Sequence, residues 1–234
     1  MEKIIEVLTY TMIFVFVHEL NAISYLKENN LENIEYNKNV HSNIVDIINV
    51  IMSISISIVY LITSYKIKDN RLYGIDEMGI KVVLVHIALF IYEIFYNIFD
   101  EKNVVMFIHH IIVILIFSYS IYRQFLQFYI STGGIVEITN VFLKPLTLFK
   151  RNEIFLDKLV YPGIGLFLSF IFARLILLPY VYYILLHDSD YVKQEDIVHY
   201  NVGKCIILVI FLLSCYWFMK ITRILLKEGK KIFK

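Results

Sequence analysis

Charged residues, glycine, proline and cysteine are all scarce in this 234-residue chain. Charged residues make up 18% of it and hydrophobic residues 59%, whereas a typical soluble domain has about 25% charged residues. The mean hydropathy is +0.67. A single water-soluble core cannot bury so large an apolar excess, so the composition predicts an integral membrane protein.

The low net charge and the shortage of cysteine exclude further classes of protein. The formal net charge is only +1, and we expect no nucleic-acid partner because such binding depends on neutralising phosphates. Cys205 and Cys215 lie in one apolar run, where helical geometry turns their side chains apart. We therefore expect neither a disulfide framework nor a metal knuckle. The seven histidines form no H-x-x-H box, so no metal site is expected.

Apolar runs of about membrane-spanning length recur along the chain between charged clusters. They predict an all-α, polytopic membrane bundle of about seven transmembrane helices. The fifth run is the weakest because it contains Gly133, Gly134, Glu137, Thr139 and Asn140, and it can cross a membrane only with its polar face buried. The first run lacks an A-x-A cleavage site and is expected to be retained. The runs are 4–26, 43–65, 78–99, 104–122, 124–143, 160–186 and 202–226.

The distribution of lysine and arginine predicts the orientation of these runs. With seven spans, thirteen of these residues fall in loops on one side and six on the other. This bias places the C-terminus in the cytosol and the N-terminus across the membrane. An arrangement without the fifth span gives a stronger bias and places the N-terminus in the cytosol. The charge distribution alone therefore does not decide whether the number of spans is six or seven. The polar stretch 27–42 is expected to be a loop.

Ionisable side chains inside the spans are the candidate functional residues, because a charge within a membrane is costly unless it is paired or hydrated. In the predicted topology Glu93, His109, His110 and Glu137 lie roughly 8–9 Å inside the cytosolic ends of their spans, at about 1.5 Å per residue. Such a belt suggests a cavity open to the cytosol. A histidine beside a carboxylate can act as a general base, although such pairs also hold helices together. The full set is His18, Glu19, Asp46, Lys81, His86, Glu93, His109, His110, Glu137, Arg174 and Lys204.

Sequence spacing gives these candidates an expected geometry. Adjacent residues His109 and His110 diverge by about 100° on a helix, which argues against joint metal ligation. Glu137 and Asn140 are three residues apart and share a face.

Arg174 stands near the middle of the sixth run. There it needs an acid, backbone carbonyls or an anionic group such as a phosphate, and a structural salt bridge is at least as good an interpretation as a ligand site. Pro179, further along the same run, is expected to kink the helix.

Two segments, FIHHIIVILIFSYS (107–120) and GGIVEITNVFLKP (133–145), carry a family resemblance. Ceramide synthases have an HH pair opening one span and a D-x-x-D pair on the next, and here Glu137 and Asn140 stand at the corresponding offset. FLSFIFARLILLPY is similar to the F-x-x-R segment of the same family. From about residue 36 to 228 the chain resembles the TLC-domain family, and it is closer to the smaller members than to the ceramide synthases.

The resemblance implies a helical bundle around a lipid-accommodating cavity. It implies an N-terminal helix and loop at 1–35, a TLC-like membrane domain at 36–228 and a basic cytosolic tail at 229–234. The implied function is lipid binding, sensing or transport that affects membrane composition, with membrane lipids as partners and the endoplasmic reticulum or a related endomembrane as location. Protein partners are not implied.

The alternative is an acyl-CoA-dependent lipid N-acyltransferase, with acyl-CoA as co-substrate and no other cofactor. In that case the resemblance makes His109 or His110 the base and Glu137 its polar partner. The family's D-x-x-D pair has become E-x-x-N here, which argues against ceramide synthase activity. For lipid binding, the candidate residues are Glu93, Asn140 and Arg174.

Overall fold

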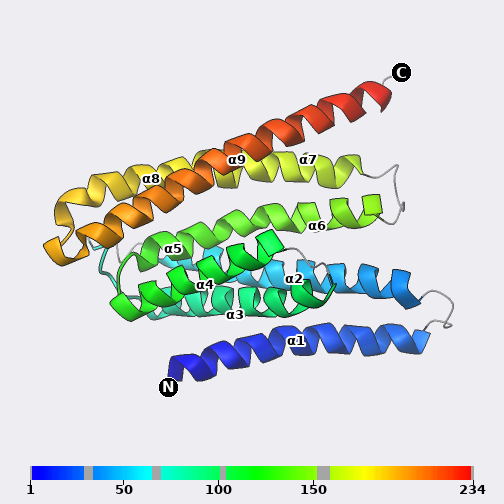
Figure 1. Ribbon diagram of the computed structural model, residues 1–234, viewed down its shortest axis with the longest axis horizontal. Helices are drawn as coiled ribbons and strands as arrows, with labels where there is room; N and C mark the ends of the chain where they lie inside the picture. Colours follow the sequence, from blue (N-terminus) through cyan, green and yellow to red (C-terminus); the bar gives the residue numbers. More distant parts are fainter. Residues whose placement is uncertain (1, 29–33, 65–69, 101–103, 152–158, 233–234) are drawn as a thin grey trace. The chain divides into compact units, whose positions relative to one another are not determined.

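In the part of the chain that the structure describes, residues form seven helical segments and no strand (Figure 1). This computed structural model describes residues 2–28, 34–64, 70–100, 104–151 and 159–232, and side chains within 2–19, 44–64, 70–95, 104, 107–150 and 159–226. The first four segments are single helices: α1 (Glu2–Glu28), α2 (Ile34–Thr63), α3 (Glu77–Asp100) and α4 (Val104–Arg123).

The fifth and sixth segments are interrupted helices. The fifth consists of α5 (Gln127–Gly133), a 3-10 turn (Gly134–Glu137) and α6 (Ile138–Arg151). The sixth consists of α7 (Val160–Ser169), a π-helical segment (Phe170–Leu177) and α8 (Leu178–His187). The last helix is α9 (Ile197–Ile232). The all-α class and the seven helical segments are thus confirmed.

The chain divides into two compact units, Met1–Ile135 and Val136–Lys234. In the first unit α3 is the central helix and packs against α1, α2, α4 and α5. Its sequence explains this position, because the run from Val82 to Phe90 is apolar on all sides apart from His86 and is buried throughout. A helix that is apolar all round is stable only when neighbours cover it on every side.

The second unit is built around α9. This helix packs against α7, the π-helical segment and α8, while α6 packs against α7 and the π-helical segment. Phe167 of α7 stacks on Phe218 of α9 with ring centroids 5.1 Å apart. The Tyr200 hydroxyl donates to the carbonyl oxygen of Leu185 at 2.8 Å and joins α9 to α8 at the other end.

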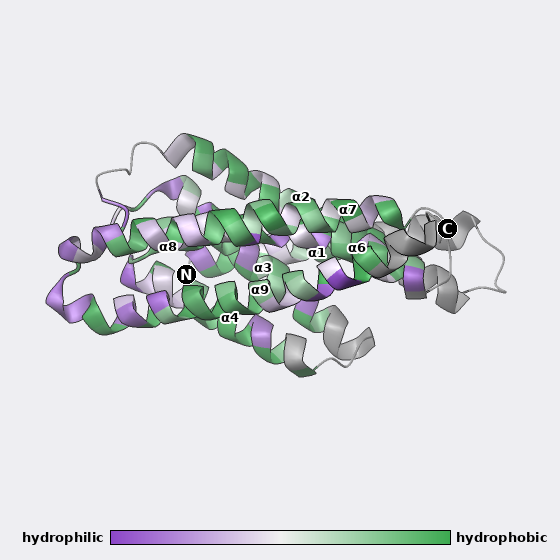
Figure 2. Ribbon diagram, turned by 90° about the horizontal axis from the view of Figure 1, so that it is seen from above, coloured by the Kyte–Doolittle hydropathy of each residue, from purple (hydrophilic) through white to green (hydrophobic). Residues whose placement is uncertain are grey.

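Four of the described stretches are long and apolar enough to cross a membrane: Ile44–Thr63, Glu77–Phe95, Val160–Tyr191 and Gln194–Leu226. Phe107–Arg123 is a shorter apolar helix. Hydrophobic residues dominate the helices in Figure 2. The chain is therefore an integral, multi-pass membrane protein. A full crossing by the first, fourth and fifth predicted spans stays a prediction.

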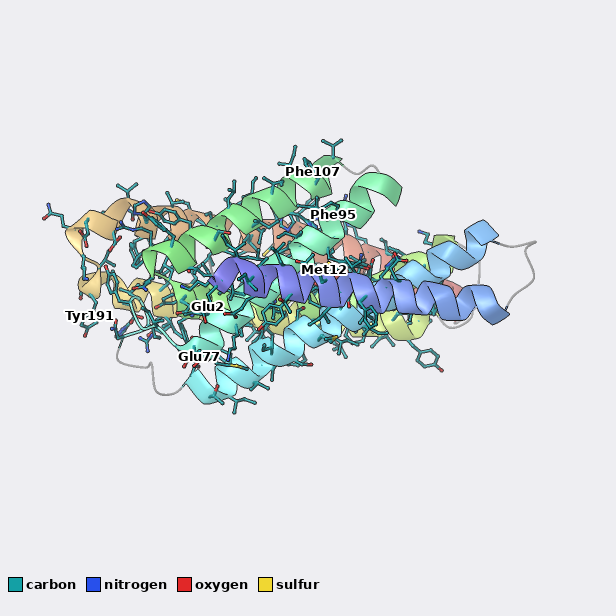
Figure 3. All side chains as sticks on the ribbon, turned by 90° about the horizontal axis from the view of Figure 1, so that it is seen from below. Glu2, Met12, Glu77, Phe95, Phe107 and Tyr191 are labelled. Carbon is teal, nitrogen blue, oxygen red and sulfur yellow. The ribbon has the colours of Figure 1, made fainter. Side chains whose placement is uncertain are left out.

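The outer surface of the first unit is apolar as well. Met12, Phe95 and Phe107 point outward from α1, α3 and α4 (Figure 3). Large apolar side chains exposed in this way suit contact with lipid tails, because the bilayer core is an apolar solvent.

The expected loop at 27–42 is wrong. The structure continues α1 to Glu28 and begins α2 at Ile34, so most of this stretch is helical. The stretch is polar but contains good helix formers such as Glu and Lys, and a helix that has already nucleated extends readily through them. The boundary of the fifth run also differs, because α6 continues past 143 and through Pro145 to Arg151.

Candidate functional site

In the first unit a chain of two hydrogen bonds joins three helices. The Tyr92 hydroxyl donates to Asp46 Oδ1 at 3.0 Å, and His18 Nδ1 lies 2.9 Å from the same hydroxyl oxygen. A phenol has one proton, so the bond to Asp46 leaves the oxygen as acceptor and requires His18 Nδ1 to donate. The order His18, Tyr92, Asp46 connects α1, α3 and α2.

The next residue of α3 makes a second acid–histidine contact. Glu93 Oε2 lies 3.4 Å from His110 Nδ1 of α4, and both side chains are buried. The Phe90 ring meets the His110 imidazole edge-on, with centroids 5.3 Å apart. A carboxylate beside an imidazole in such surroundings can orient the ring and exchange a proton with it.

His109 and His110 diverge, as their adjacent positions predict. His110 is buried against α3, whereas His109 lies on the exposed side of α4, and their ring centroids are 5.6 Å apart. Of the two, only His110 faces the interior of the first unit.

His86 lies further towards the start of α3 and is buried. Its Nδ1 lies 2.9 Å from the Val82 carbonyl oxygen and donates to it, because a carbonyl oxygen can only accept. A Cβ built on Gly134 would lie only 2.6 Å from this Nε2 and 2.9 Å from Ser57 Oγ. Gly134, one of the residues that make the fifth predicted span less apolar, therefore leaves the space that the His86 ring occupies.

In the second unit Arg174 is held by neutral oxygens. Its Nε and Nη2 donate to Thr139 Oγ1 at 3.2 and 3.1 Å, and Nη2 also donates to the Val136 carbonyl at 3.5 Å. The guanidinium carbon lies 5.1 Å from the centroid of the Phe170 ring. Of the partners expected for Arg174 from the sequence, the structure supplies a backbone carbonyl and an acid, Glu137, which interacts with the guanidinium electrostatically.

Glu137 and Asn140 share a face and bond to each other. Asn140 Nδ2 donates to Glu137 Oε2 at 2.5 Å, which confirms the expected geometry. The Glu137 carboxylate also interacts electrostatically with Arg174. The end of the 3-10 turn, the start of α6 and the π-helical segment therefore bring together one acid, one amide, one hydroxyl and one guanidinium.

Arg174 lies within the π-helical segment. It runs from Phe170 to Leu177 and ends two residues before Pro179, which stands in the first turn of α8. Proline has no N–H to donate to the preceding turn, and π-helical turns are frequent at functional sites. The kink expected at Pro179 stays a prediction.

The remaining ionisable candidates have ordinary surroundings. Lys81 pairs with Glu77 at 2.8 Å, four residues before it on the exposed side of α3, and Lys204 lies 4.6 Å from the centroid of the Tyr200 ring. Glu19 is exposed on α1. No cluster of three or more His, Cys, Asp or Glu able to hold a metal ion occurs among the described residues.

The structure thus forms two polar groups, one in each unit. His18, Asp46, Glu93 and His110 belong to the first, and Glu137, Asn140 and Arg174 to the second. The expected partnership of His110 with Glu137 stays a prediction. Sequence reasoning noted Thr139 as a polar residue of the fifth run but gave no role to Thr139 or Tyr92, because a tyrosine or threonine in an apolar run carries no charge to mark its partners.

Comparison with known families gives one match. A family model described as the TLC domain (TRAM_LAG1_CLN8) matches residues 39–223. The match contains every residue of the two polar groups except His18. A comparison with individual curated proteins gave no significant match.

Proposed function

We propose that this chain, which belongs to the TLC-domain family, binds the headgroup of an anionic membrane lipid at Arg174 and handles that lipid within the bilayer. Membership of the family makes the protein's function lipid-related. Binding, sensing or transport of one lipid, in the endoplasmic reticulum or a related membrane, is the finer proposal.

The arrangement around Arg174 is the observation that carries this proposal. Its hydrogen bonds go to a hydroxyl and a carbonyl, so they orient the guanidinium without neutralising it. A guanidinium binds a phosphate oxygen pair bidentately, and a positive charge inside a membrane-spanning segment needs an anion or water to offset it. The Glu137 carboxylate interacts with Arg174 and also accepts a hydrogen bond from Asn140, so its charge is shared between two partners. A lipid phosphate would supply the remaining negative charge.

The experiment compares lipids that co-purify with the wild-type protein and with Arg174→Gln, by mass spectrometry after extraction in native membrane discs. We expect R174Q to lose its bound anionic lipid by at least about tenfold, equivalent to about 1.4 kcal/mol. Arg174→Lys keeps the charge but loses the planar fork, and should retain an intermediate amount. Lys204→Gln, which removes another cation of the same unit, is the matched control. Undiminished anionic lipid on R174Q would contradict the proposal.

A second candidate function is acyl-CoA-dependent N-acyl transfer. The observation that favours it is the buried contact between His110 and Glu93, because a general base needs an orienting partner. The assay supplies a labelled sphingoid base and a panel of acyl-CoAs to membranes that lack the host enzymes. Product that forms with His109→Ala but not with His110→Asn would favour this function. Absence of product with the wild-type protein would count against it.

A further inference from the structure

One face of α9 carries all the basic residues in the second half of this helix. At about 100° per residue they fall within about 100° of the helix circumference. The one acidic residue of the same half, Glu228, falls outside that sector. We name the five basic residues the α9 basic face. They are Lys220, Arg223, Lys227, Lys230 and Lys231.

The α9 basic face lies opposite the side of the helix that packs on α7. Phe218 marks the packed side, because its ring stacks on Phe167 of α7. Leu225 marks it as well, since a Cβ built on Gly163 of α7 would lie 3.2 Å from Leu225 Cδ2. By helical register both residues stand about 170° from the centre of the basic face. The face is therefore turned away from α7, and Arg223 on it is exposed.

The basic face begins where α9 leaves its apolar stretch. Leu208 and Leu212 are exposed along that stretch, as suits a helix in contact with lipid tails. Tyr216 and Trp217 follow and are exposed too, and Lys220 Nζ lies 4.8 Å from the centroids of both rings. Tyrosine and tryptophan concentrate at the level of the lipid headgroups. Lys220 is thus held over two rings at the membrane interface.

Two ordinary explanations for basic residues at a helix end leave this arrangement unexplained. The orientation of a membrane protein depends on the number of lysines and arginines on each side, whatever face of a helix they occupy. The helix dipole favours cations only within the last turn, and Lys220 and Arg223 precede that turn. A restriction to one face is what contact with a flat charged surface requires.

The place and charge of the basic face identify the surface that it fits. A helix that leaves the bilayer is surrounded at that level by lipid headgroups, and anionic headgroups complement a row of cations. In the predicted topology this end of α9 is cytosolic, the side on which membranes carry anionic lipid. From Lys220 to Lys231 the face extends over about 16 Å at about 1.5 Å per residue. It presents a row of charges, unlike the single guanidinium of Arg174.

We propose that the α9 basic face lies against the anionic headgroups of the leaflet from which α9 emerges, and gathers anionic lipid beside Trp217. The attraction is the sum of several charges at a surface, so it depends on salt. This site is independent of lipid binding at Arg174.

The test uses Trp217, the only tryptophan of the chain, as the reporter in the full-length protein. The protein is reconstituted into vesicles of phosphatidylcholine and phosphatidylserine at one fixed composition. In one set the phosphatidylserine has brominated acyl chains, and in the other set the phosphatidylcholine does. Bromine quenches tryptophan fluorescence only at short range. The ratio of the two quenching efficiencies, each taken per brominated lipid, therefore measures the preference for anionic lipid beside Trp217.

We expect the wild-type ratio to be at least about two and to fall towards one as salt is added. Exchanging two neighbours, Lys227→Glu with Glu228→Lys, keeps the composition and net charge but places an acid within the basic face. This exchange should remove at least about half of the preference, and Arg223→Gln is a second variant that should lower it. Lys204→Gln, near the other end of α9, and Arg174→Gln should keep the wild-type ratio.

Three outcomes would overturn the proposal. Equal quenching by the two lipids in the wild-type protein would leave the basic face for an acidic protein partner. A ratio that both the exchange of Lys227 with Glu228 and R223Q leave unchanged would show that the face does not matter. A ratio that falls to one in R174Q would assign the preference to the lipid at Arg174. The Tm of each variant shows that a lost preference does not come from unfolding.

Discussion

Tyr92 of α3 donates a hydrogen bond to Asp46 of α2, and through the same oxygen it accepts one from His18 of α1. A single hydroxyl therefore holds three helices at one point. α1 ends before residue 39, where the TLC match begins, so the hydroxyl also fastens a helix from outside the matched region to the matched residues. The two hydrogen bonds therefore attach the N-terminal helix to residues within the TLC match.

Replacing Tyr92 by phenylalanine should remove both of these hydrogen bonds. The substitution keeps the ring and removes the hydroxyl, which leaves the buried His18 and the half-buried Asp46 without their shared partner. We expect a loss of about 1–3 kcal/mol in the free energy of unfolding. Thermal unfolding in detergent measures it. Tyr122→Phe, at an exposed position of α4, is the control and should leave Tm unchanged; equal Tm values for the two variants would contradict this role of Tyr92.

Gly134 and Gly133 offer a matched pair. Gly134→Ala would place a methyl group 2.6 Å from His86 Nε2, and we expect a destabilisation of about 1–3 kcal/mol from overpacking. A Cβ at Gly133 meets nothing within 4 Å, so Gly133→Ala should stabilise by about 0.4–1 kcal/mol through the reduced entropy of the unfolded chain. Chemical unfolding in mixed micelles measures both, and similar effects of the two substitutions would count against the close packing of His86.

Thr139 should matter more to the second unit than its neutral side chain suggests. Thr139→Val keeps the shape but removes the oxygen that accepts from Nε and Nη2 of Arg174. We expect a loss of about 1–3 kcal/mol, because a charged donor is left short of partners. Thr147→Val on the same helix is the control, since that hydroxyl is exposed and donates only to carbonyls of its own helix. The measurement is the midpoint of thermal unfolding for each variant.

The contact between Glu93 and His110 should show strong energetic coupling. In a double-mutant cycle with Glu93→Gln and His110→Gln, we expect a coupling of about 1–3 kcal/mol, because residues in direct contact are not independent. The same cycle on the exposed pair Glu77 and Lys81 should give a weaker coupling, since solvent screens charges at a surface. Comparable couplings for the two pairs would argue against a buried interaction at Glu93.

Local spacing decided which parts of the site could be predicted. Glu137 and Asn140 are three residues apart on a helix, so their contact follows from periodicity alone. The pairing of His110 with Glu93 joins positions on different helices, and the sequence marked both residues as ionisable but the family resemblance gave Glu137 as the partner. Tyr92 and Thr139 were given no role because both act by hydrogen-bonding ionisable side chains on other helices. The sequence alone does not show which helices lie side by side.

The fold was easier to predict than its boundaries. Apolar runs of spanning length predicted the seven helical segments because burial in lipid leaves few alternatives to a helix. The ends were misjudged where polarity was taken for irregular structure, as at 27–42, which is largely helical. Hydropathy reports which environment a segment occupies, and a helix can leave the membrane without changing its conformation.

The π-helical segment from Phe170 to Leu177 affects how the sixth helical segment tolerates the insertion or deletion of a residue. Its hydrogen bonds reach one residue further than those of an α-helix, so the segment accommodates a residue that a regular helix would not. Deleting one residue here would restore α-helical pairing and leave the direction of α8 relative to α7 little changed, because the wide turns already take up that residue. A deletion or insertion in the regular turns of α7 or α8 would instead turn every later side chain of the helix by about 100°.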